Sequence, residues 1–116
     1  MNDFFNPFGG EQEPQCLEIN ASNKNGWKNK VGNDGGGPWN AHWENFSGKK
    51  FDKQLCSREY CFDPAEVGAH VIRPSDGSKE WITPFCQEHN VKENLPNVPA
   101  EYFDLKVGTI LVYADA

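Results

Sequence analysis

Long apolar runs are absent from this sequence, and apolar residues are scarce. Only 37% of the 116 residues are hydrophobic, and no stretch approaches the roughly 18 consecutive apolar residues of a membrane-spanning helix. The first ten residues contain Asp3 and neither a basic stretch nor an apolar core, so they differ from a secretory signal peptide. We therefore expect a cytoplasmic protein with no membrane span and one small hydrophobic core.

Positive charge is also scarce, and it is concentrated in one part of the chain. The formal net charge at pH 7 is −6, because residues 1–23 contribute a net −4 and residues 59–116 a net −6. Residues 24–58 contain seven bases and three acids. The overall acidity disfavours nonspecific binding to nucleic acid, which depends on neutralising phosphates. The basic segment leaves two alternatives open: a local patch that binds nucleic acid, or an ordinary solvated loop surface.

Four residues have the spacing of a metal site. Cys56 and Cys61 form one close pair, and Cys86 and His89 form a second close pair after 24 intervening residues. Two close pairs separated by a longer insert are typical of structural zinc sites, where Zn²⁺ takes four tetrahedral thiolate and imidazole ligands. We therefore predict one closed Zn²⁺ site, which would support the small core and leave no open position for catalysis.

The cysteines have a second interpretation. Four cysteines can form two disulfides in three connectivities. A reducing cytoplasm keeps thiols free for a metal, which favours zinc over disulfides here. Cys16 lies far from the other three cysteines, and we interpret it as a free thiol.

The two halves of the chain differ in regularity. Asn, Gly and Pro dominate the start, so we expect an irregular, partly mobile segment over residues 1–38 and a zinc-binding domain over residues 39–116. Helical spacing predicts a short helix over residues 39–46. Its aromatic cluster either packs on the zinc module or forms a partner surface. The members of this cluster are Trp39, His42, Trp43 and Phe46.

The pattern of residues in the second half of the sequence predicts several short strands and one short helix. Runs of β-forming residues indicate strands over residues 68–73, 80–85, 101–105 and 109–113. The first two strands form a hairpin, closed by a Pro-Ser-Asp-Gly-Ser turn. A short helix over residues 87–92 follows, with the second ligand pair at its start. A ligand turn, a hairpin and a ligand-bearing helix in this order predict a small α+β, zinc-stabilised treble clef.

The hairpin and the second ligand pair resemble the core of the HNH endonuclease superfamily. The segments that carry the resemblance are Gly68-Ala69-His70-Val71 and Pro84-Phe85-Cys86-Gln87-Glu88-His89-Asn90. The resemblance implies a ββα-metal fold, with His70 at the general-base position and Asn90 at the last position that contacts the catalytic metal. It also places the four predicted ligands on structural zinc positions. The superfamily has a metal-binding Asp or His where this chain has Ala69. On that basis, Ala69→Asp is the single change expected to restore a catalytic ligand.

A longer resemblance covers residues 39–113. It includes His42-Trp43-Glu44-Asn45-Phe46-Ser47-Gly48, then C-S-x-x-x-C, G-A-H-V and P-x-C-x-x-H-N. These motifs are similar to those of small, mostly uncharacterised bacterial and mobile-element proteins that keep alanine in G-A-H-V. This resemblance implies a fold and a zinc site but no activity.

Two functions of different classes remain. The first is a non-catalytic zinc-binding interaction module, encoded by a phage or mobile element, that acts on a protein partner. Its acidity suits a basic surface, such as that of a host nucleic-acid-binding or defence protein that it would inhibit. The second is a divergent HNH-type metal-dependent nuclease that uses His70 as the base. Alternatively, His70 is a buried histidine bonded to the backbone beside the zinc site, and Asn90 caps or pins the turn after the zinc ligands. Ala69 and the net charge favour the first function, and the oligomeric state stays open.

Overall fold

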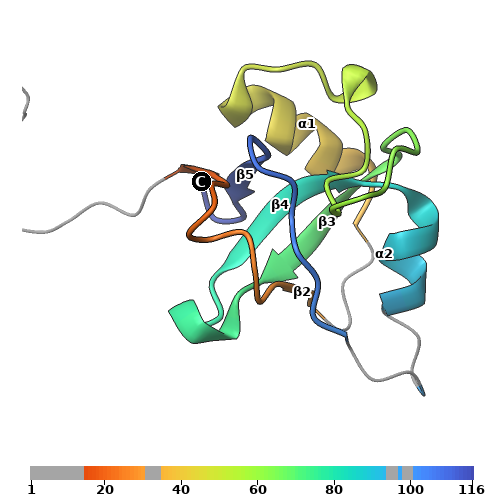
Figure 1. Ribbon diagram of the computed structural model, residues 1–116. Helices are drawn as coiled ribbons and strands as arrows, with labels where there is room; N and C mark the ends of the chain where they lie inside the picture. Colours follow the sequence, from red (N-terminus) through yellow and green to blue (C-terminus); the bar gives the residue numbers. More distant parts are fainter. Residues whose placement is uncertain (1–14, 31–34, 94–96, 98–100) are drawn as a thin grey trace, which may run out of the picture.

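One antiparallel sheet of five strands forms the centre of the protein. The computed structural model describes residues 15–30, 35–93, 97 and 101–116 (Figure 1). The strands lie in the order β1-β5-β4-β3-β2. Their bounds are β1 Cys16–Glu18, β2 Lys28–Asn29, β3 Val67–Ile72, β4 Glu80–Phe85 and β5 Ile110–Tyr113. The helices are α1 Gly37–Ser47 and α2 Gln87–Glu93, with short 3₁₀ helices η1 Phe51–Lys53 and η2 Pro74–Asp76.

The hairpin of β3 and β4 confirms the prediction from β-forming residues. Its register pairs Val67 with Phe85 and His70 with Ile82. The connecting turn contains η2, which is capped by Gly77, whose φ of 87° lies in the left-handed region that suits glycine. The predicted helix over residues 87–92 is also confirmed, as α2. None of the helices in the part of the chain that the structure describes is long and apolar enough to cross a bilayer.

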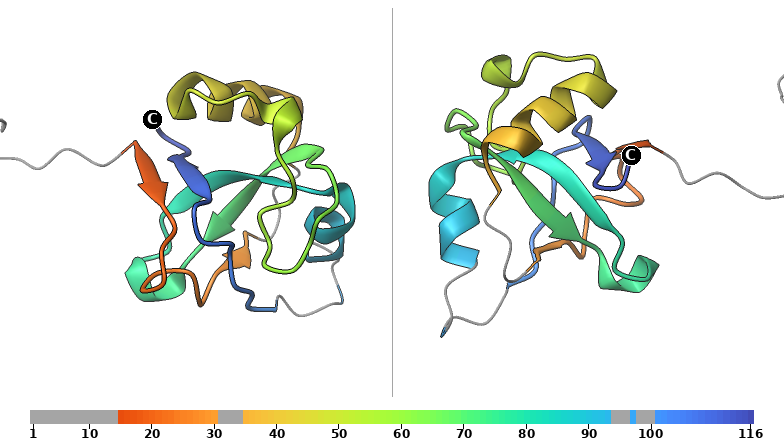
Figure 2. Two further views of the ribbon diagram at one scale, coloured as in Figure 1. Left: turned by 45° about the horizontal axis from the view of Figure 1, so that its top comes forward. Right: turned by 180° about the vertical axis from the view of Figure 1, so that it is seen from behind.

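The two faces of the sheet carry separate buried clusters. We call the first the ligand face, because its cluster includes Cys56 and Cys86 together with Trp27 and Phe85. The second is the helix face, where α1 covers the sheet and Trp43 joins a cluster of its own. Both views of Figure 2 show α1 running across one side of the sheet, with α2 at a different side. Side chains that alternate along β3 and β4 therefore enter different clusters.

Helix α1 confirms the helix predicted over residues 39–46. It begins with Pro38 near its N-terminus and ends at Gly48, which adopts the left-handed conformation common after helices. Trp43 is buried, and its Nε1 donates a hydrogen bond of 2.9 Å to the carbonyl oxygen of Ile110 in β5. Its ring also meets the Phe51 ring edge-on, with centroids 5.9 Å apart. These contacts hold α1 against the sheet.

Helix α1 approaches β3 closely at Gly68. A Cβ atom at this position would lie 2.9 Å from the Trp39 carbonyl carbon and 3.0 Å from the Trp39 oxygen. Because those atoms belong to the backbone, they cannot move aside without shifting the helix. We expect Gly68→Ala to lower the free energy of unfolding by about 1–3 kcal/mol, the usual cost of overpacking. Urea denaturation measures this change, and an unaltered midpoint would contradict the close approach.

Two predictions about secondary structure are wrong. Residues 1–38 were expected to be irregular, but β1 and β2 from this range pair with β5 and β3. Residues 101–105 were expected to form a strand, but they contribute only isolated bridges at Phe103 and Leu105. These segments are two or three residues long or make single bridges, so they lack the alternation that marks a strand in sequence. Of the segment that was expected to be partly mobile, residues 1–14 and 31–34 lie outside the described residues.

Candidate metal centre

Four potential ligands from separate segments meet at one end of the hairpin. Cys56 and Cys61 lie in the loop between η1 and β3, Cys86 follows β4 directly, and His89 lies in α2. One ligand atom from each residue lies within 4.8 Å of the other three. The predicted set is therefore brought together, and its arrangement is compatible with a bound metal ion.

The distances between the ligand atoms fit tetrahedral coordination. The Sγ atom of Cys86 lies 3.2 Å from Nδ1 of His89, and the Sγ atom of Cys56 lies 3.6 Å from the same nitrogen. The Sγ atoms of Cys61 and Cys86 are 4.0 Å apart. Metal–sulfur bonds of about 2.3 Å and metal–nitrogen bonds of about 2.0 Å would separate tetrahedral ligand atoms by about 3.5–3.8 Å. These three distances scatter around this range, all the ligand atoms lie within 4.8 Å of one another, and His89 presents its Nδ1 atom.

Backbone hydrogen bonds shape the loop that carries the first pair. The Cys56 amide donates to the Asp63 oxygen at 2.8 Å, and the Cys61 amide donates to the Arg58 oxygen at 3.1 Å. Tyr60, inside this turn, has a φ of 72°, a conformation that is uncommon for residues other than glycine. The loop is thus a tight turn that directs both thiols inward.

Contacts with β4 and with the C-terminal segment fix the position of the loop. The Ser57 amide donates to the Pro84 oxygen at 2.9 Å, and the Ser57 and Thr83 hydroxyls are 2.8 Å apart. The Lys106 ammonium donates to the Cys56 oxygen at 2.7 Å. The first ligand pair is therefore attached to the strand that leads into the second pair.

Burial and mutual repulsion oppose ionisation of the thiols. Burial raises the pKa of the Cys56 thiol to about 12, and the nearby Cys86 and Cys61 thiols add to this effect. Burial also raises the pKa of the Cys86 thiol. Because a metal ion binds thiolates, loading the site must release protons. Affinity for the metal is therefore expected to weaken as pH falls.

His70 lies on the helix face, away from the metal centre. It is buried, and its ring meets the Trp39 ring edge-on at a centroid distance of 4.5 Å. Its Nδ1 atom has no hydrogen-bond partner within the described residues. Burial lowers the pKa of His70, Glu80 partly opposes this shift, and Lys30 and His42 reinforce it. The imidazole is therefore neutral at pH 7, and its Nδ1 is not bonded to the backbone.

Ala69 points to the opposite face from His70. It is fully buried in the same cluster as Trp27, Val71 and Phe85, on the ligand face. A side chain at position 69 therefore cannot reach an ion bound beside His70. The structure therefore gives no support to the expectation that Ala69→Asp restores a catalytic ligand, because adjacent residues of a strand point to opposite sides of the sheet.

Asn90 and His70 lie outside the group of potential metal ligands found among the described residues. Asn90 is buried in α2, where its amide nitrogen would lie 3.5 Å from a Cβ atom at Gly35. Among the residues with described positions, the three cysteines with His89 are the one group of three or more His, Cys, Asp or Glu side chains placed to hold an ion. The two residues that the HNH resemblance links to catalysis therefore lack a charged ligand cluster between them.

The aromatic cluster of α1 mainly stabilises the fold. His42 Nε2 lies 2.9 Å from the Tyr113 oxygen, and the His42 ring contacts Trp39 and Phe46 with centroids 5.3 and 5.0 Å away. Only Phe46 is substantially open to solvent, at 37% exposure. The cluster packs on the helix face of the sheet, so it does not cover the metal centre.

The sequence analysis did not identify the most exposed large apolar side chains of the ligand loop as candidate functional residues. Tyr60 is 84% exposed and Phe62 is 72% exposed, and they flank the ligand Cys61. Two aromatic residues on either side of a metal ligand are a signal that could have been noticed. They also line a surface hollow of about 450 Å³ together with the acidic residues Asp63 and Glu88.

No protein-family model, curated protein or solved structure matches this chain.

Proposed function

We propose that the protein is a zinc-stabilised, non-catalytic interaction module that acts on a protein partner. The observation that carries this proposal is the exposure of Tyr60 and Phe62 on the loop that holds two ligands. Exposed aromatic residues in a rigid setting are typical anchors of protein interfaces. Here, the loop would be made rigid by the ion that its cysteines bind.

Zinc is the metal that suits these ligands best. Three thiols and one imidazole are the soft and intermediate donors of structural zinc sites, and hard ions such as Mg²⁺ prefer oxygen. Four protein ligands at tetrahedral distances fill the coordination sphere. An ion held in this way supports the fold and has no open position to activate water.

The charge around the exposed aromatics indicates a basic partner. Three acidic residues, Glu59, Asp63 and Glu88, and one basic residue, Arg58, line the same hollow as Tyr60 and Phe62. Glu59 pairs with Lys24, and the described residues show no ion pair for Asp63 or Glu88. The Lys106 ammonium already lies 4.8 Å from the centroid of the Phe62 ring, so this aromatic face attracts a cation within the protein itself. A partner that offers lysine or arginine side chains would complement both features.

The double variant Tyr60→Ser/Phe62→Ser tests the proposed surface. We expect this variant to fold normally, because both side chains are exposed. The amount of cross-linked partner that it recovers should fall at least about tenfold, since interface aromatics often contribute more than 1 kcal/mol each. Quantitative mass spectrometry after cross-linking in the producing cells measures the partner. Phe46→Ser is the matched control, because it removes an exposed aromatic from α1. Loss of the partner with Phe46→Ser alone would place the interface on α1 and contradict the proposal.

One observation favours the alternative, a divergent metal-dependent nuclease. The neutral imidazole of His70 has the protonation state that a general base requires. However, the described residues supply no anionic ligand cluster beside it for a catalytic metal. The alternative is tested directly by the cleavage assay in the Discussion.

A further inference from the structure

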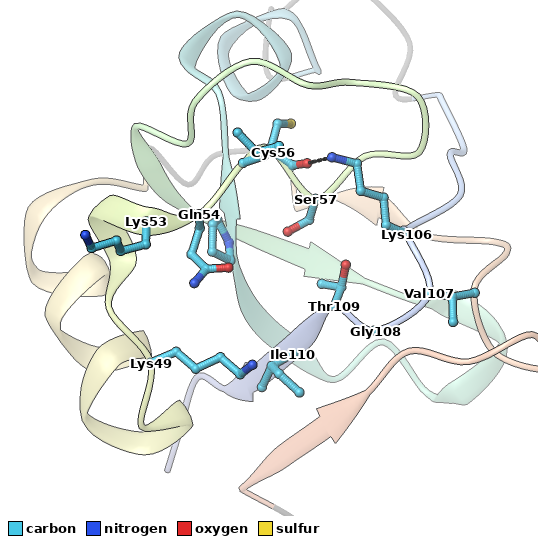
Figure 3. Close-up of a pocket in the computed structure, with 12 residues that line it drawn as sticks. Lys49, Lys53, Gln54, Cys56, Ser57, Lys106, Val107, Gly108, Thr109 and Ile110 are labelled. Atoms are coloured by element: carbon cyan, nitrogen blue, oxygen red, sulfur yellow. Dashed lines mark hydrogen bonds between the residues drawn. The ribbon is translucent and has the colours of Figure 1, made fainter.

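A cavity of about 330 Å³ opens behind the first ligand, between η1 and the segment that leads into β5 (Figure 3). Three lysines line it: Lys49, Lys53 and Lys106. Among the described residues, no aspartate or glutamate lines it. In a chain with a formal net charge of −6, this hollow is a local concentration of positive charge. We call it the lysine pocket.

Among the described residues, no carboxylate forms an ion pair with the three lysines. The ion pairs found there include those of Lys24, Lys30 and Arg73, and none involves a lysine of the pocket. The Lys106 ammonium donates a hydrogen bond to the Cys56 oxygen and lies over the Phe62 ring, so it contributes positive charge to the pocket while Lys49 and Lys53 remain the lysines open to a ligand. Like charges gathered around one hollow repel each other, and a bound anion would relieve that repulsion.

The remaining walls suit a ligand with both polar and apolar parts. The hydroxyls of Ser57 and Thr109 lie on the wall between the lysines, and Lys49 reaches across the pocket toward Ile110 (Figure 3). Leu55 and Val107 add exposed apolar surface to the rim. Small-molecule sites commonly combine such apolar walls with a few polar groups, in volumes of about 300–1,000 Å³.

We propose that the lysine pocket binds a phosphate monoester, with the phosphate held by Lys49, whose ammonium points across the pocket (Figure 3), in the positive field of Lys53 and Lys106, and with a small organic group against Leu55 and Val107. A compact ligand suits the pocket better than a nucleic-acid strand does. An extended strand needs a continuous basic track, whereas the positive charge here is confined to one hollow of an acidic protein. This proposal is independent of the protein partner and of the metal's identity.

The test titrates the metal-loaded protein with phenyl phosphate and follows backbone amide signals by NMR. We expect saturable shifts confined to residues 49–57 and 106–110. The double variant Lys49→Gln/Lys53→Gln should raise the Kd at least about tenfold, because each lysine can supply a charge-assisted hydrogen bond. Both side chains are exposed, so the variant should keep its fold. Lys106 stays unchanged, since it also holds the ligand loop.

Lys50→Gln is the matched control. It removes the same charge from the same segment, but Lys50 is exposed and does not line the pocket, so we expect its Kd to change less than about twofold. An equal loss of affinity in Lys50→Gln would assign the effect to diffuse charge and overturn the proposal. A lack of saturable shifts would also overturn it. Binding of a single-stranded oligonucleotide more tightly than phenyl phosphate, with loss in the same double variant, would replace it with a nucleic-acid surface.

Discussion

Removal of the metal by a chelator is expected to unfold the ligand loop, the β3–β4 hairpin and α2 together. Cys56 and Cys86 are buried members of the main hydrophobic cluster, so loss of the ion would leave three crowded thiols inside the core. Zinc binding in small domains contributes about 10–16 kcal/mol of apparent free energy, which matches or exceeds the roughly 5–15 kcal/mol of a typical domain. Cys86→Ser should have the same effect, because it removes a ligand at the junction of β4 and α2.

Far-UV and near-UV circular dichroism before and after chelation measure this unfolding, and metal analysis should give one zinc per chain. Cys16→Ser is the matched control, because Cys16 is an exposed cysteine outside the ligand set. We expect this control to bind zinc and to keep its melting temperature within a few degrees of the parent, as surface substitutions usually do. Purified protein without zinc, or a fold that survives chelation unchanged, would contradict the prediction.

The ligand set and the central hairpin could be predicted because their signals are local. The two ligand pairs have short internal spacings, and the hairpin strands are six residues each with a turn of characteristic residues between them. The helix α1 was predictable for a similar reason, since its aromatic residues recur at helical spacing. In each case, neighbouring residues carry enough information to specify the element.

The edges of the sheet could not be predicted from such signals. Strand β1 has three residues and β2 has two, and each is defined by its partner strand, β5 or β3. Trp27 is fully buried and bridges to Phe103, a contact between residues 76 positions apart that nothing local specifies. Sequence-distant pairing of this kind depends on the assembled core, so the Asn- and Gly-rich segment was interpreted as irregular.

The lysine pocket and the exposed aromatics also depend on the assembled fold. Lys49 and Lys53 come from the segment after α1, whereas Lys106 comes from the segment before β5, and only the folded chain brings them together. The division of the sheet into two faces was, by contrast, available from the sequence. Adjacent residues of a predicted strand point to opposite sides, so Ala69 and His70 could have been assigned to different faces.

That division of faces leads to a large expected effect for Ala69→Asp. Ala69 has no solvent exposure and lies in the cluster that contains Trp27, Val71 and Phe85. An aspartate there would be buried without a cation or hydrogen-bond donors provided for it. We expect a loss of about 3–5 kcal/mol in the free energy of unfolding, the usual cost of an uncompensated buried charge. Ala41→Asp is the matched control, because Ala41 is exposed on α1, and its effect should stay within about 0.5 kcal/mol.

Neither the parent protein nor Ala69→Asp is expected to cut DNA. Single-metal phosphodiester cleavage needs a metal that stabilises charge on the phosphate and a base that activates water. His70 could act as the base, but its side chain lies on the helix face, where the described residues form no metal-binding group, and position 69 faces the other way. A plasmid-nicking assay with Mg²⁺, Mn²⁺ and Ni²⁺ should therefore show no activity above that of His70→Ala. Nicking by the parent protein that disappears in His70→Ala would establish the nuclease function instead, and with it a catalytic metal site on the helix face.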